Sequence, residues 1–162
     1  MMKENDNYIK VMEDCCRMSK DGIKLAWNGE VTGEGTITGG KLSTNIAIPE
    51  SLGGSGNGTD PKELLVSSAA TCYLTTLVSI LQNRKVPVEE QTMQSDVEIG
   101  EDKSITIIHY PQVTLASNAS SDDKENAEKA MHGADNACFI GKLLKNAGVT
   151  IEMKPEVISK QA

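Results

Sequence analysis

An uncharged segment, residues 64–81, constrains the fold more than any other part of this sequence. Its aliphatic side chains fall on every side of a helix, and a helix that is apolar all round is buried all round. Serine and threonine dilute the segment and no anchoring residues flank it, so it does not match a membrane span. We therefore predict a long, buried central helix that closes at residues 83–85, just before Pro87.

Three residues give this helix a defined start. Asp60 can cap free backbone N–H groups, Pro61 fits the first helical position, and Glu63 completes a capping box. One thiol, Cys72, lies near the middle of the helix among alanine and threonine neighbours. Such small neighbours allow another backbone or a ligand to approach the thiol closely.

Length and composition narrow the class of protein. The 162 residues predict a single domain over residues 21–162, preceded by a polar extension over residues 1–20. A net charge of −7 and an aromatic content of 3% argue against nucleic acid and anionic membranes as partners. The sequence has no apolar leader segment, so we expect a cytoplasmic protein in which cysteines are free, catalytic or metal-bound rather than structural disulfides. The neighbouring Cys15 and Cys16 lack metal-ligand spacing, and we assign them no function.

The rest of the chain alternates between strand and helix patterns. A glycine-rich loop before the central helix lacks the lysine of a phosphate-binding loop and is interpreted as a connector. His109 falls in an ordinary strand pattern. The expected order is βββ-α-ββ-α-β, an α+β domain. Its elements are an antiparallel meander over 22–48, the central helix, strands over 86–101 and 103–117, a second helix from 120 or 121 to about 146, and a strand over 150–158.

The second predicted helix carries another thiol, Cys138, on a face of small residues. If this face meets the face around Cys72, the two thiols are neighbours. The residues alone leave a second interpretation open, in which both cysteines are buried, inert and act as small hydrophobic side chains. The small-residue face consists of Ala127, Ala130, Met131, Ala134 and Cys138.

Two motifs bear on this choice. The first is GTDPKELLVSSAATC, and the second is ADNACFIGKLL, whose cysteine follows the first by 66 residues and precedes a closing strand. Their spacing and the element order resemble the OsmC/Ohr family of osmotically inducible and organic hydroperoxide resistance proteins, over roughly residues 22–157. The resemblance implies an intertwined homodimer whose sheets wrap around two central helices. It also implies a cysteine-based hydroperoxide reductase that uses no metal, flavin or haem.

By this resemblance, Cys72 is the peroxidatic thiol and Cys138 is the resolving thiol. A thiolate attacks the peroxide to give a sulfenic acid, and the second thiol converts it to a disulfide. An external dithiol, typically of the lipoyl type in this family, then reduces the disulfide. Tyr73, with Leu74 and Met131, could form apolar walls for the alkyl chain of an organic hydroperoxide. The alternative is a non-catalytic ligand-binding protein or redox latch on the same fold.

The sequence departs from the family at the position that activates the thiolate. The family usually carries a glutamate where this chain has Lys62, and that glutamate pairs with an arginine of the N-terminal sheet. The only arginines here are Arg17 and Arg84, and neither lies in the N-terminal sheet. Lys62 is therefore a candidate cation in place of the glutamate–arginine pair of the family. It precedes Cys72 by ten residues, about 15 Å along a helix, so it would act on the thiol of the partner in a dimer. The other interpretation of Lys62 is a solvated lysine at the helix start. The neighbouring Glu63 is a second candidate for activating the thiol, but its capping-box role is explanation enough and is favoured.

Overall fold

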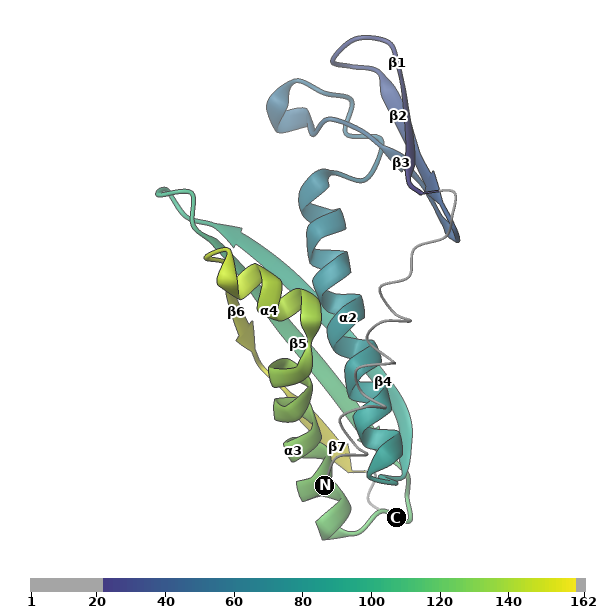
Figure 1. The fold of residues 1–162 in the computed structure, drawn as a ribbon, viewed down its shortest axis with the longest axis vertical. Helices are drawn as coiled ribbons and strands as arrows, with labels where there is room; N and C mark the ends of the chain where they lie inside the picture. Colours follow the sequence, from purple (N-terminus) through teal and green to yellow (C-terminus); the bar gives the residue numbers. More distant parts are fainter. Residues whose placement is uncertain (1–21, 160–162) are drawn as a thin grey trace. The chain divides into compact units, whose positions relative to one another are not determined.

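The computed structural model describes residues 22–159. The predicted extension, with Cys15 and Cys16, lies outside the described residues. The chain divides between Leu64 and Leu65 into two compact units (Figure 1). Helix α2 begins in the first unit and continues into the second.

The first unit contains the predicted antiparallel meander. Strands β1 (Lys24–Asn28), β2 (Glu34–Gly39) and β3 (Leu42–Ile46) pair in the order β1-β2-β3. A short 3-10 helix, η1 (Glu50–Leu52), lies in the glycine-rich connector that follows. This part of the chain therefore matches the order of elements predicted from its alternating pattern.

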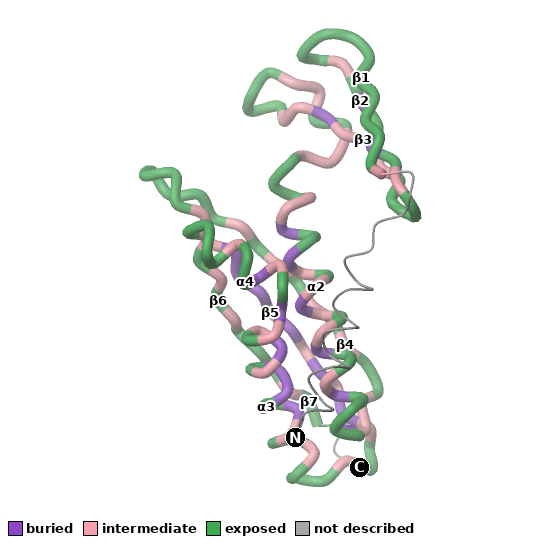
Figure 2. Tube along the Cα trace, in the orientation of Figure 1, coloured by how far each residue is buried: buried purple, intermediate pink, exposed green. Residues whose placement is uncertain are grey.

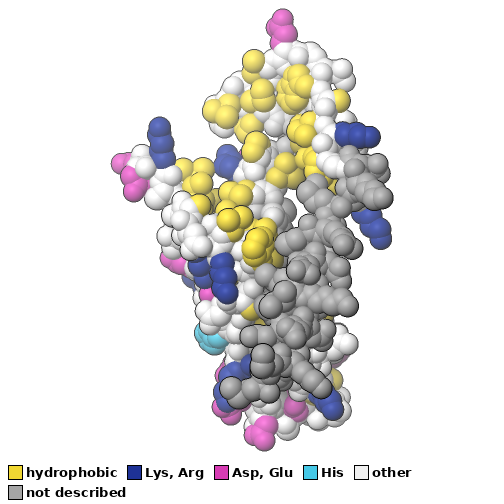
Figure 3. Space-filling view, viewed as in Figure 1, with side chains coloured by type: hydrophobic (Ala, Val, Ile, Leu, Met, Phe, Trp, Pro, Cys, Tyr) yellow, Lys and Arg dark blue, Asp and Glu magenta, His cyan; other side chains and the backbone are white. Residues whose placement is uncertain are grey.

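The meander leaves much of its apolar surface uncovered within the chain. Every residue of β1 is exposed, and Figure 2 shows this strand without buried positions. Figure 3 shows hydrophobic side chains gathered at the surface of this unit. The large exposed hydrophobic residues here are Ile23, Leu25, Trp27, Val31, Leu42 and Leu52.

Helix α2 (Pro61–Asn83) begins with the predicted capping box. The Asp60 Oδ1 atom accepts hydrogen bonds from the backbone N–H groups of Lys62 at 2.7 Å and Glu63 at 2.9 Å. In return, the backbone N–H of Asp60 donates to Glu63 Oε2 at 3.1 Å. Burial is the largest single influence and raises the pKa of Asp60, but the two N–H donors and the Lys62 ammonium together hold it below its ordinary value. The helix ends where Lys85 adopts a left-handed backbone with φ of 57°.

Within one chain α2 is buried on one face only, so the prediction of burial on all sides is wrong for the chain by itself. Serine and threonine dominate the opposite face, where several hydroxyls donate to backbone carbonyls of the preceding turn, as Thr76 does to Cys72 at 2.8 Å. By length and composition α2 could cross a membrane, and 28% of its apolar window is buried inside the protein. The buried face consists of Val66, Ala69, Tyr73, Leu77 and Leu81.

The second unit is built on a sheet centred on β5 (Ile105–Leu115). Strand β4 (Val88–Ile99) pairs with β5 antiparallel, while β6 (Thr150–Met153) and β7 (Glu156–Ser159) pair with it in parallel. The predicted final strand is thus divided in two. Pro155 lies in the gap and has no backbone N–H to donate, while Lys154 donates its N–H to the His109 carbonyl at 2.8 Å.

The second predicted helix is also divided, and the break is at Cys138. Helix α3 (Ser121–Ala137) starts with a capping box between Ser120 and Asp123, and α4 (Phe139–Asn146) follows after one extended residue. A shared core joins α2, α3 and β5, so the α+β fold class is confirmed. The core residues are Tyr73, Leu77, Leu81, Val86, Val113, Leu115, Ala127, Ala130, Met131, Ala134 and Cys138.

Candidate functional site

Cys138 forms the corner between α3 and α4. Its backbone is extended, with φ of −61° and ψ of 115°, and its side chain is the N-cap of α4. The Cys138 Sγ atom accepts a hydrogen bond from the backbone N–H of Gly141 at 3.3 Å. A Cβ atom at position 141 would lie 3.2 Å from this sulfur, so glycine leaves the room that the cap needs. The expectation that Cys138 sits in the middle of a helix is therefore wrong.

Cys72 reaches the same place from the middle of α2. It is half-buried and packs against the core cluster to which the fully buried Cys138 belongs. The two thiols lie close enough to interact with each other, and both are free. The fold thus brings together two cysteines that are 66 positions apart in the sequence.

The environment of Cys138 favours its protonated form. The pKa of the Cys138 thiol is raised to about 12, mainly by burial, and the neighbouring Cys72 and Asp135 contribute to this rise. The N–H of Gly141 opposes these effects because it stabilises negative charge on the sulfur. Cys138 is therefore a thiol at neutral pH and needs help to act as a nucleophile.

Tyr73, predicted as an apolar wall, is buried beside the two cysteines. Its hydroxyl donates to the Met131 carbonyl at 3.1 Å, which joins α2 to α3. Its ring stacks on the His109 ring with 6.0 Å between centroids. Burial raises the pKa of Tyr73 well above its ordinary value, so the hydroxyl stays protonated.

His109 was predicted as an ordinary strand residue, but it is buried beside this cluster with a specific partner. Its Nδ1 atom shares a hydrogen bond of 2.7 Å with the hydroxyl of Ser95, the residue opposite it on β4. Burial lowers the pKa of His109, and the Lys145 charge lowers it further while Asp135 raises it. The imidazole is therefore held neutral.

Asp135 and Lys145 place opposite charges beside this cluster. Lys145 Nζ donates to both carboxylate oxygens of Asp135, at 2.8 and 2.9 Å. The pair joins α3 to α4 across the Cys138 corner. The sequence did not predict this ion pair, because side chains ten residues apart on one continuous helix are too far apart along the axis to form one.

A family model described as OsmC-like protein matches residues 54–154, which is more than half of the chain. The chain belongs to the OsmC-like family. The curated Bacillus subtilis protein YmaD, described as uncharacterized, is 34% identical over 139 residues, covering 83% of this chain and 92% of YmaD. Residues 54–154, which the family model matches, include both thiols of the site.

Solved structures of OsmC-like proteins share the fold. The OsmC-like protein of Mycoplasma pneumoniae superposes with a TM-score of 0.67 at 14% identity, covering 85% of this chain and 96% of that one. An organic hydroperoxide resistance protein of Legionella pneumophila gives 0.60 at 19% identity, with coverage of 86% and 98%. OhrB of Bacillus subtilis, an organic hydroperoxide resistance protein, gives 0.53 at 21% identity, with coverage of 84% and 97%. At these identities the likeness establishes the fold.

In this OsmC-like protein the other predicted site residues lie at the start of α2. Lys62 Nζ is 3.4 Å from Asp60 Oδ2, and the Lys62 side chain is about half exposed. Glu63 is occupied by the capping box. Ten residues of helix separate Lys62 from Cys72, about 15 Å along the axis, so the two do not meet within one chain.

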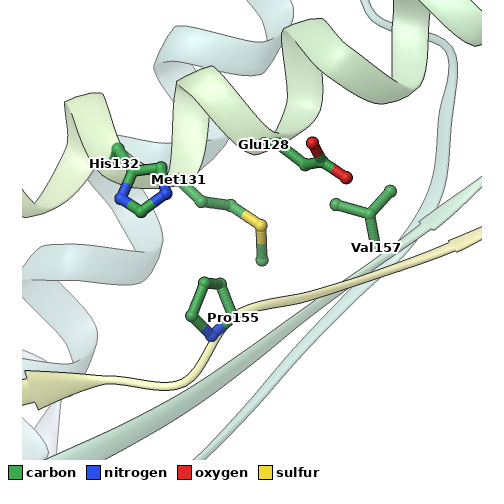
Figure 4. Close-up of a pocket in the computed structure, with 5 residues that line it drawn as sticks. All are labelled: Glu128, Met131, His132, Pro155 and Val157. Carbon is green, nitrogen blue, oxygen red and sulfur yellow. The ribbon is translucent and has the colours of Figure 1, made fainter.

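A surface pocket of about 210 Å³ lies between α3 and the β6–β7 segment (Figure 4). Met131 connects this pocket to the core, but neither thiol lines it. In the described part of the chain, no group of three or more His, Cys, Asp or Glu side chains could hold a metal ion. The lining residues are Glu128, Met131, His132, Pro155 and Val157.

Proposed function

We propose that this OsmC-like protein is a thiol peroxidase that reduces organic hydroperoxides through Cys72 and Cys138 without a metal, flavin or haem. The observation that carries the proposal is the meeting of two free thiols from α2 and the α3–α4 corner inside one apolar cluster. Cys72 is the more exposed of the two and is assigned the attack on peroxide. Cys138 is assigned the resolving step.

The first step consumes the peroxide. The Cys72 thiolate attacks the outer peroxide oxygen, the O–O bond breaks, and the alkoxide takes a proton from water to leave as an alcohol. The sulfur has then gained a hydroxyl group as a sulfenic acid. Two electrons have passed from the sulfur to the peroxide.

The second step protects the oxidised sulfur. The Cys138 thiolate attacks the Cys72 sulfenic sulfur, the S–O bond breaks, and hydroxide leaves as water after protonation. An external dithiol, of the lipoyl type or another, then reduces the disulfide by two thiol exchanges and is itself oxidised to a disulfide. No redox cofactor is needed at any stage of this cycle.

Consumption of cumene hydroperoxide in the presence of dihydrolipoamide tests the proposal. The wild type should turn over many times, and Cys72→Ser should consume none above background. Cys138→Ser should turn over more slowly than the wild type, because its sulfenic acid then depends on direct attack by the external dithiol. The double variant Cys15→Ser/Cys16→Ser is the control for the thiols outside the described residues and should keep full turnover. A Cys72→Ser variant that still turns over would contradict the proposal.

A non-catalytic redox latch is the second candidate, favoured by two observations. The pocket described above is lined by neither thiol, and the buried Cys138 thiol is strongly protonated at neutral pH. A latch would form the Cys72–Cys138 disulfide, with a mass loss of two hydrogens, under an oxidant such as diamide. It would do so without faster consumption of organic hydroperoxide than an unfolded control.

We also propose that the protein acts as a cytoplasmic homodimer without nucleic-acid or membrane partners. The exposed apolar side chains of the first unit and the uncharged exposed face of α2 support a second copy as the partner. Light scattering should give about twice the chain mass of 17.4 kDa. A particle of single-chain mass at micromolar concentration would exclude the dimer.

A further inference from the structure

The direction of the Cys138 side chain depends on a corner rather than on a continuous helix. The Cys138 N–H donates to the Ala134 carbonyl at 2.8 Å, and its carbonyl accepts from Lys142 at 3.0 Å. These bonds tie Cys138 to the end of α3 and the start of α4, respectively. Neither bond fixes the angle between the two helices. Ile140 and Leu144 of α4 pack against a core cluster that includes Ile107, and a direct contact between α3 and α4 adds a further restraint at the corner.

The Asp135–Lys145 ion pair is such a contact. Asp135 lies on the last turn of α3 and Lys145 on the last turn of α4, and two short hydrogen bonds join them. The pair is half-buried, with 36% of the Lys145 side chain and 24% of the Asp135 side chain exposed. Two parallel contacts from one ammonium restrict the geometry more than a single surface contact does.

We propose that Lys145 is a positioning residue for Cys138. It holds the Asp135 carboxylate at the α3–α4 corner, so that Cys138 meets Cys72 without an unpaired negative charge beside it. The inference rests on the proposed pairing of the two thiols and assigns a role to Lys145, which lies just outside the quoted motif that contains Asp135 and Cys138.

The charges around the corner support this role. Cys138 is influenced by Cys72 on α2 and by Asp135 on α3, and both favour its protonated form. The neighbouring Tyr73 stays protonated and His109 on β5 is neutral, so neither supplies a positive charge at neutral pH. Lys145 therefore supplies the positive charge paired with Asp135, and its loss would leave the carboxylate free to oppose deprotonation of Cys138.

The attack of Cys138 on an oxidised Cys72 sulfur can be measured with an aromatic disulfide such as Ellman's reagent, and this measurement requires no peroxidase activity. The Cys72 thiolate attacks the reagent and releases one aromatic thiolate, leaving a mixed disulfide on Cys72. The Cys138 thiolate then attacks the Cys72 sulfur and releases the second aromatic thiolate as the protein disulfide forms. With Cys15 and Cys16 replaced by serine, the rate of the second release reports how readily Cys138 attacks.

Lys145→Met should slow this second release about two- to fivefold, in proportion to a half-buried ion pair of up to about 1 kcal/mol. Its pH profile should move to higher pH, whereas Lys145→Arg should restore both the rate and the profile. Asp135→Asn should move the profile to lower pH, and it serves as the second variant if Lys145→Met is poorly folded. Lys142→Met is the matched control, because it removes an exposed lysine from the same helix.

Two results would overturn the inference alone. One is a second release in Lys145→Met at the rate of Lys142→Met, and the other is a slower release with the parent pH profile, which indicates general loosening. Absence of any second release in the parent protein would instead overturn the proposed thiol pairing, and the inference with it. The two failures are therefore distinguishable in one experiment.

Discussion

The surroundings of Cys72 and Cys138 differ although the two thiols are neighbours. Cys72 lies in the middle of a regular helix, is half-buried, and borders a face rich in serine and threonine. Cys138 lies at a break between two helices and is fully buried, and its sulfur accepts a hydrogen bond from the backbone N–H of Gly141. In the proposed cycle, Cys72 is the thiol that meets the peroxide, and Cys138 is the thiol that meets only Cys72.

This difference indicates how a protein can divide one redox cycle between two identical side chains. A half-buried thiol can be approached by a peroxide, whereas a buried and protonated thiol is kept from competing for the same oxidant. The buried thiol becomes useful only once its neighbour has been oxidised. The following predictions test this contrast, beginning with the largest expected effect.

The strongest test of the contrast is the alkylation of each thiol against pH. Burial is the largest cause of the raised pKa of Cys138, and it remains when Cys72 is replaced, so the thiol should stay mostly protonated at pH 8. In a variant with Cys72, Cys15 and Cys16 replaced by serine, its alkylation by iodoacetamide should rise about tenfold per pH unit between pH 8 and 10. The matching variant that keeps only Cys72 should react much faster at pH 8. Equal rates for the two thiols at that pH would remove the contrast.

Two glycines in the α3–α4 region allow the Cys138 cap to be perturbed with an internal control. Alanine favours a helix over glycine by about 0.5–1 kcal/mol, and at Gly133 the added Cβ would meet only Ile80 at 3.8 Å. Gly133→Ala should therefore raise the free energy of unfolding by up to about 1 kcal/mol in urea. At Gly141 the added Cβ would lie 3.2 Å from the Cys138 sulfur and push it from its present position. Gly141→Ala should not raise the free energy of unfolding, and it should slow disulfide formation about two- to fivefold. Equal unfolding free energies and equal rates of disulfide formation in the two variants would show that the cap is unimportant.

His109, whose ring stacks on Tyr73, should make the protein sensitive to acid. Because burial lowers its pKa in the folded state, the unfolded chain binds the proton more readily. The stability that the neutral imidazole contributes is complete above about pH 6.5 and is lost as the pH falls through the lowered pKa of the folded state. His109→Gln should flatten the loss of unfolding free energy between pH 7 and 5, while the exposed His132→Gln should not. The same slope in both variants would contradict this assignment.

The smallest expected effect concerns Lys62 and the activation of Cys72. The Lys62–Asp60 ion pair is partly exposed, so Lys62→Met should change the unfolding free energy by less than about 1 kcal/mol. If Lys62 of one chain serves the Cys72 of a partner, hydroperoxide reduction at neutral pH should slow about two- to threefold with the dimer intact. Lys24→Met provides a control on the N-terminal sheet. An unchanged alkylation profile for Cys72 in Lys62→Met would exclude this role.

The sequence predicted the fold well because its strongest signals are local. The capping residues of α2 and the alternation in the meander depend on neighbours a few positions away, and both were found where expected. The break at Cys138 was missed because residues 121–146 carry no proline and their small-residue face continues without interruption to the cysteine. The exposed face of α2 was missed because apolar residues surround the helix, whereas a single chain covers only one side.

The candidate site was predicted in part. Cys72 and Cys138 were singled out from their motifs, and the fold brings them together. The Asp135–Lys145 pair and the Ser95–His109 hydrogen bond could not be predicted, because each depends on a tertiary angle or a strand register. Such partners are separated by 10 and 14 residues, spacings that carry no signal before the fold is known.

The Cys138 sulfur has one further consequence for α4. In the reduced protein this sulfur accepts a hydrogen bond from the N–H of Gly141, so the redox-active atom also caps the first turn of α4. A sulfur that turns to bond Cys72 leaves that N–H without its present acceptor, and the turn becomes easier to open. The rate of amide hydrogen exchange at Gly141 should therefore be faster in the disulfide form than in the reduced form, and it reports the oxidation state of the thiols without any reagent that reacts with sulfur.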